Sequence, residues 1–254
     1  LLSQLTKKKV VYNFRQNDLK NGGQGAPFAP IFHNVLANKI SKKFNLAFPI
    51  NILNIGGIAN ITTTVIWKDL WHKSKIYAYD IGPGNCLIDE WIRSNSKKKY
   101  DRDGLKAKSG KIDKLILNQA IENFSVNSKY ENSLDIKDFN IFFAKGLSLE
   151  NGAATISNFT AKLISDGMNY VEGNLWLICG GGRKNKYLLE SIKKNFEKKK
   201  KIEAIDKYGI DGDFIESQAF AFLAIRSLEG MPISFPSTTR CKKSTTGGII
   251  VENF

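Results

Sequence analysis

One stretch constrains the fold of this chain more than any other: residues 75–85 read KIYAYDIGPGN. The pattern predicts a short buried strand, a Gly-Pro-Gly turn and then a helix that Asn85 caps. Asp80 falls where the strand meets the turn, the usual place for a ligand site on an open α/β sheet. Because the positive end of the next helix favours negative charge, we expect Asp80 to stay ionised and to be able to serve as a base. A plain strand–turn–helix junction with one exposed aspartate is the alternative interpretation.

A second glycine turn joins two β-rich runs. Gly56 and Gly57 separate residues 50–55 from residues 62–66, and this spacing predicts a β-hairpin. Glycines in such a turn leave backbone N–H groups free to hold phosphate oxygens, as an anion nest does. A hairpin that binds nothing is the alternative interpretation, because most Gly-Gly hairpins have no ligand.

A third glycine turn lies between a strong strand pattern, residues 174–179, and a helix that ends near residue 196. The turn begins with three consecutive glycines, Gly180–Gly182. A strand, a glycine turn and a helix are the usual sequence of elements at a bound nucleotide, although this turn matches neither a Walker A loop nor GxGxxG. Three glycine turns at strand ends therefore indicate an α/β fold that handles a nucleotide.

Hydrophobic periodicity predicts the remaining elements. His33 lies on an apolar helix face, where a hydrogen-bonded structural histidine is the simplest interpretation. Glu216 stands near the start of a helix whose large apolar residues are expected to be mostly buried, and we expect it close to that apolar face. A first-turn charge that complements the helix dipole is the alternative for Glu216. The predicted helices are 1–5, 30–45, 112–124, 136–147, 153–171 and 213–229, and the other strands are 9–14 and 202–205.

Composition argues against several classes of protein. The net charge of +14 comes mostly from lysines spread along the chain, with one dense run at residues 193–201. Arginine, which reads phosphates and bases better, is scarce, so we expect no nucleic-acid partner. The apolar runs are far shorter than the ~20 residues of a membrane helix, so we expect no membrane partner and a cytoplasmic location.

Metal and disulfide sites are not expected either. His33 and His72 are too few for a metal cluster, and the acids in residues 100–104 lack the further carboxylates of a calcium loop. The cysteines are odd in number, far apart and without a CxxC pair: Cys86, Cys179 and Cys241. This usage fits a reduced compartment.

Six segments, in order and spacing, resemble motifs of the anhydro-N-acetylmuramic acid kinase family. They are FRQNDLKNGGQGAPFAPIFH (14–33), NIGGIAN (54–60), YDIGPGNCLIDEW (79–91), YDRDG (100–104), CGGGRKN (179–185) and ESQAFAFLA (216–224). The resemblance implies the two-lobed, ribonuclease-H-like α/β fold of the actin/hexokinase-type ATPases. It also implies a transferase that uses ATP and Mg²⁺, opens the 1,6-anhydro bond of anhydro-N-acetylmuramic acid with water and phosphorylates O6. The product, N-acetylmuramic acid 6-phosphate, belongs to peptidoglycan recycling, and the family suggests a homodimer.

The resemblance assigns roles to residues of this chain. Asp80 would be the catalytic base that deprotonates the attacking water, and Glu216 would help to hold that water and the sugar. The other implied contacts are Gly56, Gly57 and Asn60 for the nucleotide phosphates, Gly180, Gly181, Gly182 and Asn185 for the adenosine, and Gly23, Gln24 and Gly25 for the sugar.

One family motif, a Gly-Thr-Ser…Asp-Gly phosphate loop after the first strand, is not found in these 254 residues. We therefore expect most of the N-terminal lobe to be missing. Residues 1–46 and 232–254 would be its remnant, and residues 47–231 would form the C-terminal ATPase/sugar-kinase lobe. The alternative function is then a non-catalytic remnant that binds sugar or nucleotide without turnover.

Overall fold

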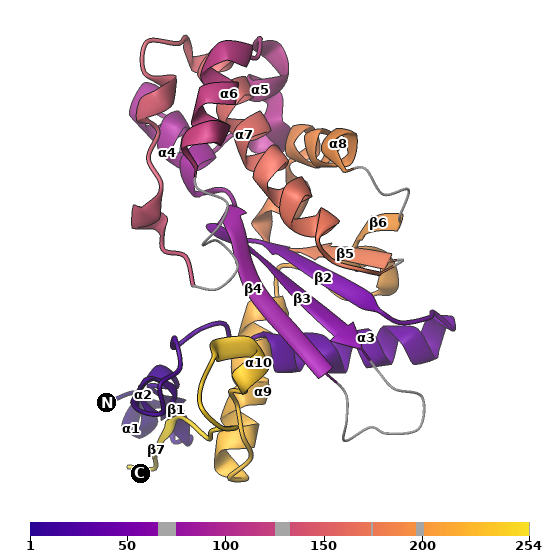
Figure 1. Ribbon diagram of the computed structural model, residues 1–254. Coiled ribbons are helices and arrows are strands. Elements are labelled where there is room, and N and C mark those ends of the chain that lie inside the picture. Colours follow the sequence, from indigo (N-terminus) through magenta and orange to yellow (C-terminus); the bar gives the residue numbers. More distant parts are fainter. Residues whose placement is uncertain (66–74, 125–132, 174, 197–200, 254) are drawn as a thin grey trace. The chain divides into compact units, whose positions relative to one another are not determined.

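A computed structural model describes residues 1–65, 75–124, 133–173, 175–196 and 201–253 (Figure 1). The chain forms two compact units. Unit 1 consists of Leu1–Phe48, Thr62–Ala78 and Phe214–Phe254, and unit 2 consists of Pro49–Ile61 and Tyr79–Asp213. Each unit is therefore built from segments that are far apart in the sequence.

Five strands form one sheet: β2 Ile50–Ile55, β3 Ile58–Val65, β4 Lys75–Pro83, β5 Leu175–Cys179 and β6 Lys201–Ala204. Their order is β4-β3-β2-β5-β6, so β2, the first of these five strands along the chain, lies in the middle of the sheet. β2 runs parallel to β5, with Ile50 opposite Leu175, and β5 runs parallel to β6. Every residue of β5 is buried, which agrees with the unbroken apolar run that predicted this strand.

The helices of unit 2 are α4 Cys86–Asn95, α5 Leu105–Ser109, α6 Lys114–Asn123, α7 Leu149–Asn169 and α8 Lys186–Asn195. They gather on one side of β2 and β5 (Figure 1). The long helix α7 packs against the four others. Gly152 of α7 lets Trp91 of α4 approach closely, since a Cβ at Gly152 would lie 2.1 Å from the Trp91 ring. The Nε1 of Trp91 donates a 2.9 Å hydrogen bond to the Leu149 carbonyl. The core of this unit includes Leu53, Ile81 and Trp176.

Unit 1 contains α1 Leu2–Thr6, β1 Val10–Tyr12, α2 Arg15–Lys20, α3 Pro30–Phe44, α9 Ile215–Leu228, α10 Pro236–Thr239 and β7 Ile249–Val251. β1 pairs antiparallel with β7, which joins segments from the two ends of the chain. α3 and α9 pack together over a small core of Phe28, Ile31, Leu223 and Ile233.

His33 has the structural role predicted from the sequence. It is buried in α3, and its Nδ1 lies 2.8 Å from the Thr62 hydroxyl oxygen. Burial lowers the pKa of His33 to about 4. The ring is therefore neutral at physiological pH and contributes packing and one hydrogen bond to unit 1.

The helix predicted over residues 136–147 is wrong. The chain forms two short 3₁₀ turns there, at Ile136–Asp138 and Phe142–Ala144. Polar side chains explain the difference, because the Asp135 carboxylate accepts from Lys137 N at 3.0 Å and the Asn140 side-chain oxygen accepts from Phe142 N at 3.1 Å. Such local hydrogen bonds compete with those of a helix, and the spacing of apolar residues gives no information about them.

The prediction that the large apolar residues of α9 and its flank are mostly buried is also wrong. Ala219 and Leu223 are buried at 2% and 1% exposure, but Phe214, Phe220 and Ile225 are 57%, 46% and 53% exposed. The helix is apolar on several faces, whereas Ala219 and Leu223 lie four residues apart on one of them. Periodicity marks a core face well only when the opposite face is polar.

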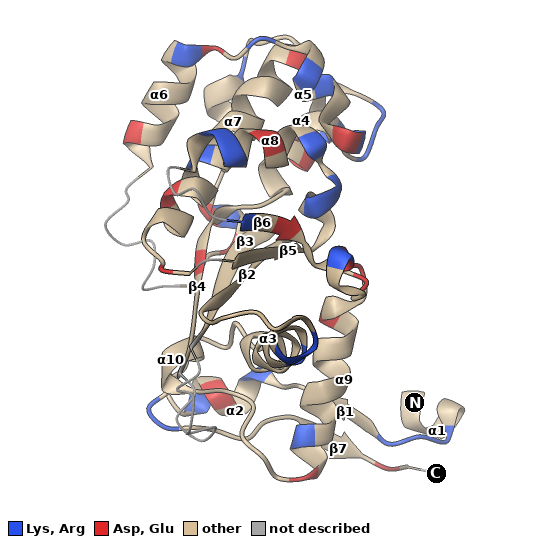
Figure 2. Ribbon diagram, turned by 90° about the vertical axis from the view of Figure 1, so that its right-hand side faces the viewer, with Lys and Arg blue, Asp and Glu red and all other residues tan. Residues whose placement is uncertain are grey.

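Basic and acidic residues share the same elements in the part of the chain that the structure describes. On α8, for example, Glu190 lies between Lys186 and Lys193 along the sequence. Figure 2 shows basic and acidic segments together on this helix. Residues 197–200 of the predicted lysine run lie outside the described residues. None of the described helices is long and apolar enough to cross a lipid bilayer. The expectation that no nucleic acid binds stays a prediction.

Candidate functional site

The Gly56–Gly57 hairpin and the Gly84–Asn85 turn are locked together. Gly84 N donates to the Gly57 carbonyl at 2.8 Å, and Asn85 N donates to the Gly56 carbonyl at 2.7 Å. A Cβ at Gly84 would lie 2.2 Å from the Gly56 oxygen, so this position has room for glycine alone. The hairpin that the sequence predicted is confirmed, and its carbonyls hold the start of α4.

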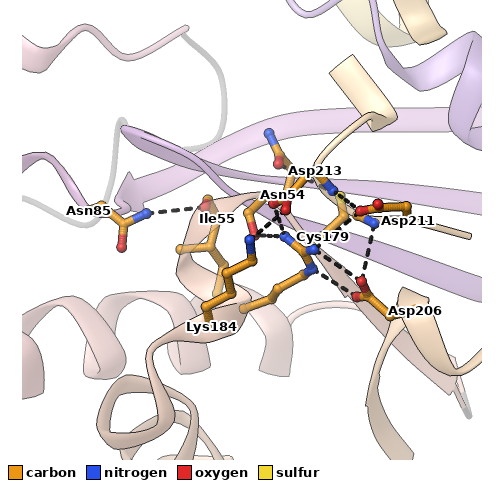
Figure 3. Close-up of polar contacts among 11 residues, drawn as sticks. Asn54, Ile55, Asn85, Cys179, Lys184, Asp206, Asp211 and Asp213 are labelled. Carbon is orange, nitrogen blue, oxygen red and sulfur yellow. Dashed lines mark hydrogen bonds and ion pairs between the residues drawn. The ribbon is translucent and has the colours of Figure 1, made fainter. Parts of the chain in front are cut away.

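Asn85 does not cap α4 as predicted. It precedes the helix, but its side chain makes no cap bond and instead donates from Nδ2 to the Ile55 carbonyl at 3.3 Å (Figure 3). The hairpin carbonyls satisfy the first N–H groups of the junction, so a side-chain cap is not required. Asn85 thereby connects the end of β2 to the start of α4.

The triple-glycine turn closes on the same end of β2. Gly180 has a left-handed φ of +78°, and a Cβ there would lie 2.6 Å from the Ile55 carbonyl oxygen. Gly181–Lys184 then form a 3₁₀ turn before α8. The three glycine turns predicted from separate parts of the sequence therefore meet at the carboxyl end of β2. Gly57 and Gly181 are exposed there.

Asn185 and Asn60 have different surroundings. Asn185 is 7% exposed, and its Oδ1 accepts from Leu188 N at 3.0 Å, which makes it the N-cap of α8. Asn60 is half-buried in β3. The structural role of Asn185 was not predicted, although Asn before an apolar helix pattern is a recognised cap signal. Its contact with a nucleotide stays a prediction.

Asp80 lies within β4, not at its end, because the strand continues to Pro83. It is 8% exposed, and its Oδ2 accepts a 2.9 Å hydrogen bond from Leu134 N. Burial raises the pKa of Asp80 from 3.8 to about 6, and the bond from Leu134 only partly opposes this. Burial, rather than the neighbouring helix end that the sequence pointed to, therefore dominates the pKa of Asp80, while the expectation that this group stays ionised at neutral pH agrees with a pKa of about 6. At pH 7 the group is still about nine-tenths ionised, with a pKa suited to a general base.

Glu216, in unit 1, lies in the first turn of α9. Its side chain is exposed, so the prediction that it lies close to the apolar face is wrong. The observed position agrees with the alternative interpretation, a charge that complements the helix dipole. A role for Glu216 at a substrate stays a prediction.

The loop Gly23-Gln24-Gly25, also in unit 1, folds around a buried carboxylate that sequence analysis did not single out. Asp18 is 1% exposed; its Oδ1 accepts from the Thr239 hydroxyl at 2.6 Å and its Oδ2 accepts from Gly25 N at 2.8 Å. Gln24 N donates to the Thr239 carbonyl at 2.8 Å. The loop conformation is therefore fixed by Asp18, which lies inside a family motif.

A second unpredicted group surrounds Arg183, and we call Asp206, Asp211 and Asp213 the aspartate cluster. The Arg183 side chain is 5% exposed. Its Nε and Nη2 donate to the two oxygens of Asp206 at 2.8 and 3.0 Å, and its Nη1 donates to Asp213 Oδ1 at 2.7 Å. Lys184 also pairs with Asp213 (Figure 3).

Electrostatics agree with this geometry. The hydrogen bonds from Arg183 hold the pKa of Asp206 below its ordinary value and lower that of Asp213 to about 2. The Arg183 pKa is raised, chiefly by the bond with Asp206. All of these groups are charged at physiological pH.

Metal ligands do not gather among the described residues, where no three His, Cys, Asp or Glu side chains lie close enough to hold an ion. Asp101, in the predicted weak calcium loop, accepts instead from Lys106 N and Ala107 N at 2.8 and 3.0 Å and so caps α5. His72 lies outside the described residues. The three cysteines are free and buried.

Comparisons with known proteins match almost the whole chain. The family model described as anhydro-N-acetylmuramic acid kinase matches residues 1–253. The kinase of that name from Pelagibacter ubique is 51% identical over 263 aligned residues, which cover 100% of this chain and 68% of that protein. Those from Rhodospirillum rubrum and Brucella anthropi are 36% and 37% identical, over 98% and 99% of this chain and 63% and 65% of their own lengths.

A solved structure, the activator of the 2-hydroxyisocaproyl-CoA dehydratase from Clostridium difficile with bound ADPNP, aligns at 12% identity with a TM-score of 0.43, over 78% of this chain and 68% of that one. The chain spans about two thirds of the length of the sequence relatives named above. The resemblance seen in the six motifs is confirmed by the family model and these relatives: the chain belongs to the anhydro-N-acetylmuramic acid kinase family.

Proposed function

We propose that this protein is an ATP-dependent kinase that opens the 1,6-anhydro bond of anhydro-N-acetylmuramic acid with water and phosphorylates O6. The support is its family, whose relatives carry that name. The single observation that carries the proposal is a buried carboxylate, Asp80, four residues before the point where the glycine turns meet. A base and an anion-binding backbone are what this reaction requires.

The fold that we propose is the two-lobed, ribonuclease-H-like fold of the actin/hexokinase-type ATPases. Its support is the order of the five-stranded sheet, in which β2 is central and pairs in parallel with β5. We propose residues 1–46 and 232–254 for one lobe and residues 47–231 for the other. The compact units have different bounds, because unit 1 also contains Thr62–Ala78 and the helix α9. We also propose a cytoplasmic location, on the grounds of the cysteine usage and the short apolar runs, and a homodimer, on the grounds of the family resemblance.

In the proposed chemistry, water attacks the anomeric carbon and its proton passes to the Asp80 carboxylate. The bond from the anomeric carbon to O6 breaks, and O6 takes up the γ-phosphoryl group of ATP as the bond from the γ-phosphorus to the β,γ-bridging oxygen breaks and ADP leaves. This arrangement resembles an inverting glycosidase, except that O6 is phosphorylated where a glycosidase would protonate it. Glu216 would help to hold the water and the sugar, and the Gly23-Gln24-Gly25 loop would contact the sugar.

The glycine turns fit ATP. Gly57 and Gly181 are exposed at these turns, and neither has a side chain, so an anionic ligand can come close to the backbone there. We propose Gly56, Gly57 and Asn60 for the phosphates, and Gly180–Gly182 with Asn185 for the adenosine. Mg²⁺ would neutralise phosphate charge; because the described residues gather no three ligands, it would be held mainly by phosphates and water.

The test is to incubate the protein with ATP and anhydro-N-acetylmuramic acid in H₂¹⁸O and to analyse the product by mass spectrometry. We expect N-acetylmuramic acid 6-phosphate with one ¹⁸O at the anomeric hydroxyl and none in the phosphate, because water attacks carbon and O6 stays with the sugar. Phosphorylation without ring opening would contradict the proposed mechanism. Sugar binding without product would favour the non-catalytic alternative.

The pH dependence of the reaction follows from Asp80. A general base acts only when deprotonated, and burial places the pKa of this group at about 6. We expect kcat/KM to be level above about pH 7 and to fall about tenfold per pH unit below about pH 6. Initial rates between pH 4.5 and 8.5 would check this, and a level profile across that range would contradict the role of Asp80.

A further inference from the structure

Arg183 follows the triple glycine, where an arginine would ordinarily be expected to bind a phosphate. Its guanidinium group is instead engaged by the protein on every nitrogen. Nε and Nη2 donate to Asp206, and Nη1 donates to both Asp213 and the Gly180 carbonyl, the last at 3.1 Å. With 5% of its side chain exposed, Arg183 has little surface left for a ligand.

The Gly180 carbonyl is the point where this network reaches the turn. It accepts from Arg183 N at 3.2 Å as well as from Arg183 Nη1, so one residue holds it through both main chain and side chain. On the opposite side, Asn54 Oδ1 and the Ile55 carbonyl lie 2.5 and 2.6 Å from where a Gly180 Cβ would be. The turn is therefore held between the end of β2 and the Arg183 side chain.

The aspartate cluster anchors that side chain within unit 2. Its carboxylates are 43% exposed at Asp206, 55% at Asp211 and 45% at Asp213, so water solvates them in part. The buried guanidinium of Arg183, in contrast, needs its partners, because an unpaired buried charge lowers the stability of the folded protein. Removing the cation leaves carboxylates that water can solvate, so a variant without Arg183 is expected to fold.

We propose that Arg183 is a positioning residue for the nucleotide: by fixing the Gly180 carbonyl against the aspartate cluster, it sets the backbone of the turn Gly181–Lys184 and touches no ligand itself. This rests on the proposed function, in which that turn contacts adenosine. A planar guanidinium is needed because a lysine ammonium cannot bridge two Asp206 oxygens, Asp213 and a carbonyl in fixed directions.

The test compares Arg183→Met and Arg183→Lys with Lys106→Met, which removes another cation of unit 2, paired with Glu150 at 2.8 Å. Titration calorimetry would measure the Kd of a non-hydrolysable ATP analogue and, separately, of anhydro-N-acetylmuramic acid. We expect Arg183→Met to weaken analogue binding roughly 10- to 100-fold, since misplacing a contact by about 1 Å can have effects of that size. Arg183→Lys should recover part of the loss. The Kd of the sugar should stay near the wild-type value in the Arg183 variants. Lys106→Met should bind both the analogue and the sugar as the wild type does.

The outcomes separate this inference from the proposed function. A wild-type protein that binds no ATP analogue overturns the assignment of the turn to adenosine, and this inference with it. A wild type that binds the analogue and an Arg183→Met variant that binds it equally well overturn the inference alone. Equal weakening of analogue and sugar, in step with a lower melting temperature, would reveal a general structural role and also overturn it.

Discussion

Replacing Asp80 with asparagine is expected to abolish both ring opening and phosphorylation. Asparagine has nearly the same shape, and its side-chain oxygen can still accept from Leu134 N, but it cannot take a proton from water. Loss of general-base catalysis alone lowers a rate by about 10²–10⁴-fold. Phosphorylation falls with it, because O6 becomes free only when the anhydro bond breaks. Product formation at pH 7.5, measured by mass spectrometry, checks the prediction.

The same variant provides its own control for folding. Burial raises the pKa of Asp80 from 3.8 to about 6, so the folded protein holds this proton more tightly than the unfolded chain does. The ionised group therefore costs stability as the pH rises through this interval, and at pH 7 the cost is about 1–3 kcal/mol. Asp80→Asn should remove it and melt at or above the wild-type temperature. Full activity in this variant would contradict the role of Asp80 as the base.

Much of the candidate site was predictable because its parts follow apolar strand patterns. The runs before Gly56 and Gly180 are long and apolar enough to be recognised as buried strands, and glycines mark where each strand ends. The sequence did not predict that these turns would lie together. β2 and β5 are far apart in the sequence and lie side by side only through parallel pairing, which periodicity does not reveal.

Other features could not be predicted because they depend on tertiary contacts. Arg183 and Asp18 lie inside the family motifs, but their structural roles come from partners distant in the sequence, such as Asp206 and Thr239. The pKa of Asp80 depends on burial, and the sequence indicated only a nearby helix end of opposite influence. Residues 136–147 have helical apolar spacing, but local polar bonds override it.

Gly84→Ala is expected to lower the stability of the protein and to weaken ATP binding. An added Cβ would lie 2.2 Å from the Gly56 oxygen and 3.2 Å from the Gly57 oxygen, so backbone must move. Gly84 is buried, and overpacking of this kind typically costs about 1–3 kcal/mol. For a chain of this size each kcal/mol lowers the melting temperature by about 2–4 °C. The hairpin proposed to hold the phosphates would shift with it, so the Kd for ATP should rise.

Gly181→Ala is the matched control, because it adds the same methyl group to another turn of this site. The nearest heavy atom to its Cβ would be Asn85 Nδ2 at 3.8 Å, an ordinary contact, so stability should change by no more than about 0.5 kcal/mol. Thermal melting of both variants, with and without ATP, distinguishes a steric clash at Gly84 from a general destabilisation caused by any alanine in a glycine turn. If Gly84→Ala melted with the wild type, the hairpin and the start of α4 would not be locked as described. A loss of ATP binding in Gly181→Ala at unchanged stability would support the proposed contact of Gly181 with the nucleotide, since the nearest protein atom to the added methyl group lies at an ordinary contact distance.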